Sequence, residues 1–235
     1  LLLWELGSRT GLIPERTLAA PSAVIGTLIQ MVLSGELPSN LLVSFGRVAV
    51  GLLIGVGLGL ALGLAAGLSR GAELAIDPLM QIKRTIPALA LTPLFIVWFG
   101  IGETSKILLI FLSVFAPVVL GARSGVKSAA IEQIHAAYSF GATRWQVIRM
   151  VVLPAAMPEI FTAMRVGIGF GWTTLVAAEM VAATEGLGYM VLSASQFLQT
   201  STVIMGIVVI AAIAYAFDLL MRFVERKLVP WKGRM

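Results

Sequence analysis

The sequence contains no cysteine, a single histidine and few charged residues, which make up only 12% of its 235 residues. The absence of cysteine excludes a disulfide-stabilised fold. Soluble domains carry about 25% charged residues, so this chain has too little charge to cover a water-exposed surface. Disorder requires low hydrophobicity, whereas 58% of these residues are hydrophobic. Together with a mean hydropathy of +0.96, these absences indicate a polytopic membrane protein.

Long uncharged runs predict an all-α fold with five complete membrane-spanning helices. The second and third runs are short for a bilayer about 30 Å thick. Prolines in and beside these two runs, Pro87, Pro93 and Pro117, favour a broken-helix geometry there. The opening tract Leu1–Trp4 is interpreted as the tail of a further, truncated helix, with a short apolar N-terminus as the alternative. The five runs lie at about 41–68, 86–101, 107–122, 160–183 and 203–224.

The basic residues orient these helices, because cytoplasmic segments of membrane proteins carry an excess of Lys and Arg. Arg47 and Arg165 are placed at helix ends and left uncounted. The inner basic residues are Arg70, Lys83, Arg84, Arg123, Lys127, Arg144, Arg149, Arg222, Arg226, Lys227, Lys232 and Arg234, and the outer ones are Arg9, Arg16 and Lys106. The rule puts segments 69–85, 123–159 and the C-terminus in the cytoplasm, and segments 7–40, 102–106 and 184–202 outside, with an interfacial helix over 17–34. The chain has no linker, so residues 1–235 are expected to form one membrane domain.

A stripe of glycines runs through the first complete span. Its members recur at every fourth residue and are Gly51, Gly55, Gly59, Gly63 and Gly67. Small residues at this spacing let another helix backbone approach closely. The stripe therefore predicts a helix-packing face. Static packing explains the spacing by itself, and a helix that shifts against its neighbour during transport is the alternative.

The predicted cytoplasmic segment 123–159 is long for a connection between two spans, which suggests a function of its own. Ile131, Ile134 and Tyr138 have helical spacing, and Gly141 is expected to end their helix. A capping box at Thr143 and Gln146 then predicts a second short helix, closed by the run that ends at Pro154. The segment is interpreted as a docking element, and a surface-lying connector is the alternative.

The segment also carries a recognisable motif. His135-Ala136-Ala137, Gly141 four positions on, and Val151-x-Leu153-Pro154 after nine further residues resemble the EAA motif of ABC importer permeases. Two positions depart from the family pattern, since His135 replaces a glutamate and Val151 an isoleucine. The first change removes an acidic contact with the ATPase subunit. A lone histidine has no metal partner, so no metal site is expected.

Other stretches resemble one branch of this family, the nitrate, sulfonate and taurine permeases, and most resemble the taurine permeases. These stretches are Trp98–Lys106, Gly171–Met180 and Val229–Gly233. The resemblance covers essentially the whole chain. It implies the fold of type I ABC importer permeases, in the inner membrane of a bacterial cell.

The resemblance also implies the partners. They are a dimer of cytoplasmic ATPase subunits, a second permease chain that is expected to be identical, a periplasmic solute-binding protein and the membrane lipid, with no nucleic acid. The segment around Ile131–Phe140 would dock on the ATPase. The chain is expected to be no enzyme and to bind no cofactor, because it has no phosphate-binding loop, so ATP and Mg would be bound by the partner ATPase.

Ionisable residues within spans are candidates for a substrate pathway, because burying them without a partner is costly. Glu179, preceded by Thr173 and Thr174, is expected to contact the ammonium of a zwitterion such as taurine or to form an outer gate. A structural pair with a basic or hydroxyl group on another helix is the alternative. Arg165 is a candidate for holding an anion, with snorkelling to the surface as the alternative. Asp218 is expected to pair with Arg222, four residues on.

The function predicted from the sequence is therefore the permease subunit of an ATP-driven importer for a small sulfonate-type anion, either taurine or an aliphatic sulfonate. The same architecture with nitrate or another small anion as the solute stays open. So do two other classes of protein, a channel or secondary carrier and an intramembrane enzyme. The enzyme is disfavoured because Glu179 and Asp218 belong to opposite ends of the membrane.

Overall fold

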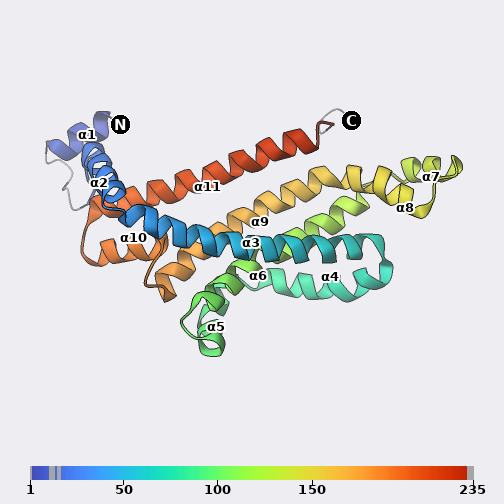
Figure 1. Cartoon of the computed structure of the whole chain (residues 1–235), viewed down its shortest axis with the longest axis horizontal. Helices are drawn as coiled ribbons and strands as arrows, with labels where there is room; N and C mark the ends of the chain where they lie inside the picture. The colour runs from blue at the N-terminus through green and yellow to red at the C-terminus, as the bar shows by residue number, and fades with distance from the viewer. Residues whose placement is uncertain (1, 11–13, 15–16, 232–235) are drawn as a thin grey trace.

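The computed structural model describes residues 2–10, 14 and 17–231. Arg16, Lys232, Gly233 and Arg234, which entered the basic-residue count or the C-terminal motif, lie outside the described residues. Within the described part all regular structure is helical, in agreement with the all-α expectation (Figure 1). The elements are α1 Leu2–Arg9, α2 Pro21–Leu33, α3 Glu36–Leu68, α4 Arg70–Thr85, η1 Ala88–Leu91, α5 Thr92–Phe99, α6 Glu103–Lys127, α7 Ile131–Ser139, α8 Arg144–Val147, η2 Ile148–Val152, α9 Leu153–Ala182, α10 Leu187–Gln196 and α11 Thr200–Leu228.

Four helical stretches are long and apolar enough to cross a membrane. They are α3, α6, the continuous stretch Arg144–Ala182, and α11. The number becomes five if α4 and the η1–α5 segment, which are bent by 85° at the break between them, are counted together as one span. The broken geometry expected from Pro87 and Pro93 is present, and counting the bent pair as one span gives the five spans of the sequence prediction. The break expected at Pro117 is wrong, because α6 continues through this residue and reaches spanning length by extending beyond the uncharged run.

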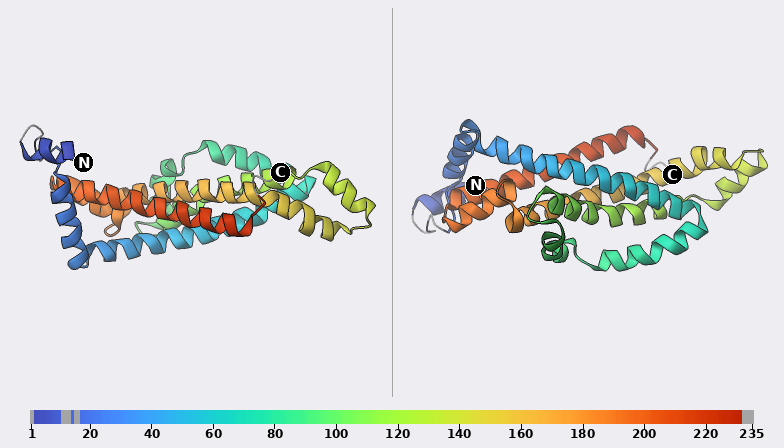
Figure 2. Two further views of the ribbon diagram at one scale, coloured as in Figure 1. Left: turned by 90° about the horizontal axis from the view of Figure 1, so that it is seen from above. Right: turned by 60° about the horizontal axis from the view of Figure 1, so that its bottom comes forward.

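The region 69–85, predicted to be a cytoplasmic segment, forms a helix that packs on the bundle. Only Ser69 separates α3 from α4, which turns back and packs along α3 and α6 (Figures 1 and 2). Met80 is buried against Phe115 and Val119 of α6. The sequence prediction took the charges of this stretch as a sign of the cytoplasm. The charged residues of α4 take part in this packing, since Glu73 and Asp77 pair with Arg123 of α6, whereas Leu74, Leu79 and Ile82 are exposed.

Helix α6 is the centre of the bundle, with α3 on one side and α9 on another. All five glycines of the α3 stripe face α6. A Cβ added at Gly51 would lie 2.6 Å from Ile110, and one added at Gly67 would reach Val126 in the same way. Since the partner number rises with the glycine number, α3 and α6 run parallel. A Cβ on α3 would collide with α6 at each of these five positions, so the two helices approach closely, as the glycine spacing predicts.

The entry to α9 differs from the sequence prediction. Pro154 was expected to close the helix that begins after Thr143, but the helix continues through Pro154 and Pro158 to Ala182. Proline has no N–H to give to the preceding turn. A π-helical turn at η2 absorbs this defect just before Pro154. The carbonyl of Pro154 is free because Pro158, four residues on, has no N–H to donate to it. It accepts a hydrogen bond from Trp231 Nε1 at 3.3 Å.

The two ends of the bundle carry different elements. Helices α1, α2 and α10 gather at one end, named here the α10 end (Figures 1 and 2). Helices α7 and α8 project from the opposite end, named the α7 end, and the C-terminus lies toward that end. The predicted interfacial helix over 17–34 is α2, which lies across the α10 end and packs on α3 and α11.

Candidate functional site

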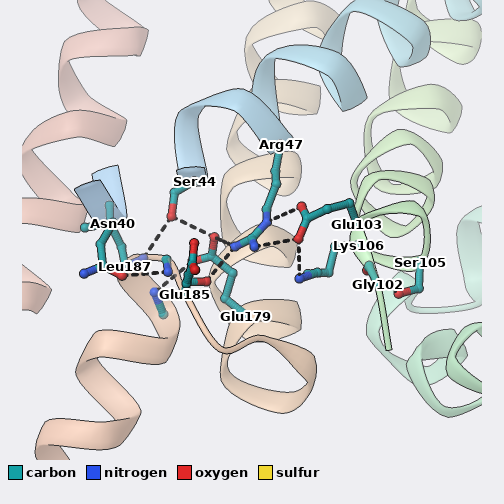
Figure 3. Close-up of polar contacts among 12 residues, drawn as sticks. Asn40, Ser44, Arg47, Gly102, Glu103, Ser105, Lys106, Glu179, Glu185 and Leu187 are labelled. Atoms are coloured by element: carbon teal, nitrogen blue, oxygen red, sulfur yellow. Dashed lines mark hydrogen bonds and ion pairs between the residues drawn. The ribbon is translucent and has the colours of Figure 1, made fainter. Parts of the chain in front are cut away.

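Glu179 lies at the centre of a buried polar network near the α10 end (Figure 3). Its side chain has no exposed surface. One carboxylate oxygen accepts hydrogen bonds from Ser44 Oγ at 2.7 Å and from Arg47 Nη1 at 2.8 Å. The other accepts from the backbone N–H of Gly188 at 2.8 Å. The carboxylate is therefore held by groups from α3 and α10, and none of its surface is left for a solute.

Arg47 connects Glu179 to a second carboxylate. The sequence analysis placed Arg47 at a helix end, which is wrong, because it lies inside α3 with 5% of its surface exposed. Its Nε and Nη2 donate to the two oxygens of Glu103 at 2.6 and 2.8 Å, and Nη1 also donates to the carbonyl of Glu185. Lys106 adds a further bond to Glu103 at 2.8 Å. Two cations and two carboxylates thus balance within one cluster that joins α3, α6 and α9.

The same network caps the N-terminus of α10. The first N–H groups of any helix lack partners within that helix. Here the N–H of Gly186 donates to Asn40 Oδ1 at 2.7 Å, and the N–H of Leu187 donates to Ser44 Oγ at 2.9 Å. Glu179 accepts a hydrogen bond from the N–H of Gly188, and its negative charge lies at the positive end of the α10 dipole. The geometry of Glu179 thus corresponds to the structural pair that was the alternative to a pathway role.

Arg165 lies in the half of α9 that is nearer the α7 end, whereas Glu179 lies in the half nearer the α10 end. Like Glu179, it forms ion pairs with other residues of the chain. It too is inside a helix rather than at an end, which corrects the sequence placement. Its guanidinium forms ion pairs with Asp218 at 2.9 Å and with Glu225 at 3.5 Å, both on α11. Asp218 pairs in turn with Arg222 at 2.7 Å, as the four-residue spacing predicts. These contacts tie α11 to α9 and give Arg165 protein partners, while its predicted role in holding an anion and the snorkelling alternative stay predictions.

Thr173 and Thr174 line a cavity of about 400 Å³, named here the α4–α9 cavity. Thr173 is exposed and Thr174 is buried. The cavity lies between the end of α4, the η1 break, α6 and α9. Its polar lining residues are Lys83, Arg84, Ser113, Thr173 and Thr174. The two basic residues were missed as site candidates because the charge rule assigned them to the cytoplasmic surface. Pro87, from which the sequence analysis predicted the break beside them, was the signal that could have placed them in the bundle.

The segment with the EAA-like motif forms the projecting α7–α8 hairpin. Gly141 has φ +81°, in the left-handed region that favours glycine. The N–H of Ala142 bonds to the carbonyl of Ala137, and that of Gly141 to the carbonyl of Tyr138. These two bonds form a Schellman motif, as expected for a helix ended by glycine. The capping box of Thr143 and Gln146 is also present, with both reciprocal bonds.

The predicted coupling residues divide into two faces of this hairpin. Ile134 and Ala137 are half-buried and pack on the core beneath the hairpin. The exposed members are Ile131, His135, Ala136, Tyr138 and Gly141, whereas Leu153 and Pro154 are half-buried at the start of α9. Two further apolar side chains that the sequence analysis did not single out are exposed here, namely Phe140 at 91% and Trp145 at 66%. The tip therefore presents a compact aromatic and aliphatic surface.

Comparison with known proteins agrees with this geometry. Residues 55–230 match the family described as binding-protein-dependent transport system inner membrane component. The chain is 45% identical to the taurine transport system permease protein TauC of Escherichia coli over 219 residues, which cover 93% of this chain and 77% of that protein. It is 40% identical to the putative aliphatic sulfonates transport permease protein SsuC of Bacillus subtilis, over 99% of this chain and 84% of that protein.

Solved structures agree at the level of the fold. A chain of the MetNI methionine ABC transporter in an inward-facing conformation superposes with a TM-score of 0.68 at 18% identity, covering 79% of this chain and 92% of that one. A chain of an amino acid ABC transporter crystallised with histidines gives 0.63 at 20% identity, covering 86% and 97%. The resemblance drawn from the motifs is thereby confirmed, and the chain belongs to the family of binding-protein-dependent transport system inner membrane components, the permeases of ABC importers.

Proposed function

We propose that this chain is the membrane-spanning permease subunit of an ATP-driven importer for a small sulfonate-type anion, taurine or an aliphatic sulfonate. The observation that carries the proposal is identity of 45% and 40%, over 93% and 99% of the chain, to permeases named for these two solutes. Glu179 pairs with Arg47, and Arg165 pairs with Asp218. These ion pairs support a permease in which the charged residues of the spanning helices hold the bundle together. Solute selection would then depend on other residues and on the binding protein.

The α7–α8 hairpin is the proposed contact with the ATPase subunits. Its exposed apolar tip, which includes Tyr138, Phe140 and Trp145, is unfavourable in water and suits burial against a partner. This assignment places the α7 end and the C-terminus in the cytoplasm, and the α10 end toward a periplasmic solute-binding protein. ATP and Mg are bound by the partner ATPase, and a second, identical permease chain completes the pathway in the bacterial inner membrane.

Uptake by the reconstituted complex tests the solute assignment. Proteoliposomes with permease, ATPase subunits and binding protein receive taurine, ethanesulfonate and nitrate in turn, and ATP-dependent uptake is measured. We expect uptake of at least one sulfonate that disappears without the ATPase subunit. Uptake of nitrate alone would favour the same architecture with another anion. Uptake that persists without the ATPase would instead show a channel or secondary carrier.

Substitutions in the hairpin test the coupling assignment. Tyr138→Ala and Trp145→Ala each remove an exposed apolar side chain, so we expect both to lower the stimulation of ATP hydrolysis by the loaded binding protein and the uptake of solute together. Leu74→Ala is the control, because Leu74 is about as exposed as Trp145 and more exposed than Tyr138 but lies on α4 outside the hairpin. Equal losses in all three variants, or none, would contradict coupling through this tip.

A further inference from the structure

The α4–α9 cavity lies deep in the membrane-spanning part of the chain. Lys83 Nζ, at the end of α4, donates a hydrogen bond to the backbone carbonyl of Leu112 in α6. Leu112 follows the first residue of α6 by nine positions and precedes the last by fifteen. At 1.5 Å per residue these separations are about 14 and 22 Å. Lys83 is therefore near the middle of a spanning helix and far from the lipid headgroups at either side.

The cavity has positive charge without a counter-charge from the protein. Lys83 and Arg84 both line it, and none of the described lining residues is acidic. Neither side chain forms an ion pair with any residue that the structure describes. By contrast, Arg47, Arg123 and Arg165 each have a carboxylate partner. Lys83 has a backbone carbonyl as its partner and Arg84 is exposed, so an anion in the cavity would meet two cations that no carboxylate neutralises.

The rest of the lining suits an oxyanion attached to a short apolar chain. Thr173 donates its hydroxyl to the carbonyl of Gly169 at 3.0 Å, and a hydroxyl can rotate to donate to a ligand instead. Phe170, Leu89 and Pro87 supply apolar wall. The volume of about 400 Å³ is within the range of about 300–1,000 Å³ that is usual for small-molecule sites.

We propose that the α4–α9 cavity is a membrane-embedded binding site for a small organic oxyanion, with Lys83 and Arg84 holding the charged head and Thr173 beside it. The identity of the anion rests on the proposed function. On that basis the anion is a sulfonate on its way through the permease. A lipid phosphate has similar chemistry, but the depth of Lys83 favours the free solute. The permease itself, and not only the binding protein, then selects for negative charge.

The natural absence of cysteine allows a direct test. Thr173→Cys introduces one exposed thiol into the cavity, and Val181→Cys introduces one on an exposed part of the same helix as a control. The permease–ATPase complex in proteoliposomes is treated with two methanethiosulfonates, one carrying an ethylsulfonate and one an ethyltrimethylammonium group. Each reagent forms a mixed disulfide with the thiolate and releases methanesulfinate. Mass spectrometry of the permease chain gives the two rates.

The measured quantity is the rate ratio of the sulfonate reagent to the ammonium reagent. We expect this ratio to be about tenfold higher at Thr173→Cys than at Val181→Cys, because the two cations concentrate anions in the cavity. Adding Lys83→Gln and Arg84→Gln should reduce the ratio to the control value, and excess ethanesulfonate should slow labelling of Thr173→Cys by either reagent. Equal ratios at the two positions would overturn the proposal. So would labelling that responds to the content of anionic lipid and not to ethanesulfonate.

Transport separates this inference from the proposed function. Arg84→Glu should lower sulfonate uptake at least tenfold, whereas Arg70→Gln, which removes an exposed cation at the first residue of α4, should leave it unchanged. Normal uptake by Arg84→Glu would overturn the cavity site and leave the proposed function intact. A wild-type complex without ATP-dependent sulfonate uptake would refute the proposed function, and the labelling ratios would still decide whether the cavity binds anions.

Discussion

Removal of the Glu179 carboxylate should destabilise the α10 end of the bundle without changing which sulfonate is transported. In Glu179→Ala, Arg47 keeps only the partly exposed Glu103 as a carboxylate partner, and the N–H of Gly188 loses its acceptor. Breaking a buried ion pair by removing one partner costs about 3–5 kcal/mol. For a chain of this size that loss corresponds to a drop in melting temperature on the order of 10 °C. Glu179→Gln retains the size and part of the hydrogen bonding, so its loss should be about half as large.

Thermal unfolding of the purified permease, followed by circular dichroism, measures these losses, and a double-mutant cycle isolates the pair. In an Arg47→Met background the additional loss from Glu179→Ala should be at least about 1 kcal/mol smaller than in the wild type, because no cation then remains unpaired. Equal losses in both backgrounds would refute the reasoning. Uptake by Glu179→Gln should fall in the same proportion for taurine and for ethanesulfonate. A selective loss of the zwitterion would show instead that the carboxylate contacts the ammonium.

Three further predictions concern packing, the hairpin and the second ion-pair cluster. Gly55→Ala places a Cβ 2.9 Å from Val114 and should lower stability by about 1–3 kcal/mol, whereas Gly57→Ala on the same helix, with nothing within 4 Å, should be neutral or slightly stabilising in thermal unfolding. Gly141→Val forces a branched residue to φ +81° and should reduce ATPase stimulation by the loaded binding protein, whereas Gly141→Asn, which tolerates that region, should retain most of it. Asp218→Asn should destabilise the chain more than Arg222→Gln in the same unfolding assay, because Arg165 is better shielded from solvent than Arg222.

The spans and the hairpin were predictable because their signals are local. The glycine stripe specifies a close helix contact through spacing alone, and the structure shows its partner to be the parallel helix α6. Gly141 and the Thr143–Gln146 pair have conformational preferences that depend on a few neighbouring residues. The sequence contains each of these motifs in full, so nothing from distant parts of the chain was needed to interpret them.

The polar network and the cavity depend on contacts between distant residues. Arg47 and Glu179 are 132 positions apart, and no pattern in the residues around either one predicts that the two form an ion pair. In the sequence, Lys83 and Arg84 resemble the basic residues that mark a cytoplasmic loop. Only the break at Pro87 and the packing of α4 on α6 show that they line a cavity of the helix bundle. Pro154 was mistaken for a helix end because a π-helical turn, which has no clear sequence signature, absorbs its missing N–H.

The uninterrupted helical stretch from Arg144 to Ala182 has a mechanical consequence. Its 39 residues form a rod about 58 Å long, which reaches from the projecting hairpin to the carboxylate of Glu179. If the hairpin docks on the ATPase as proposed, we expect a displacement applied there to be transmitted along this helix toward the α10 end, past the π-helical turn. Because Glu179 caps α10, we expect the same movement to alter how α10 is anchored at the other end of the bundle.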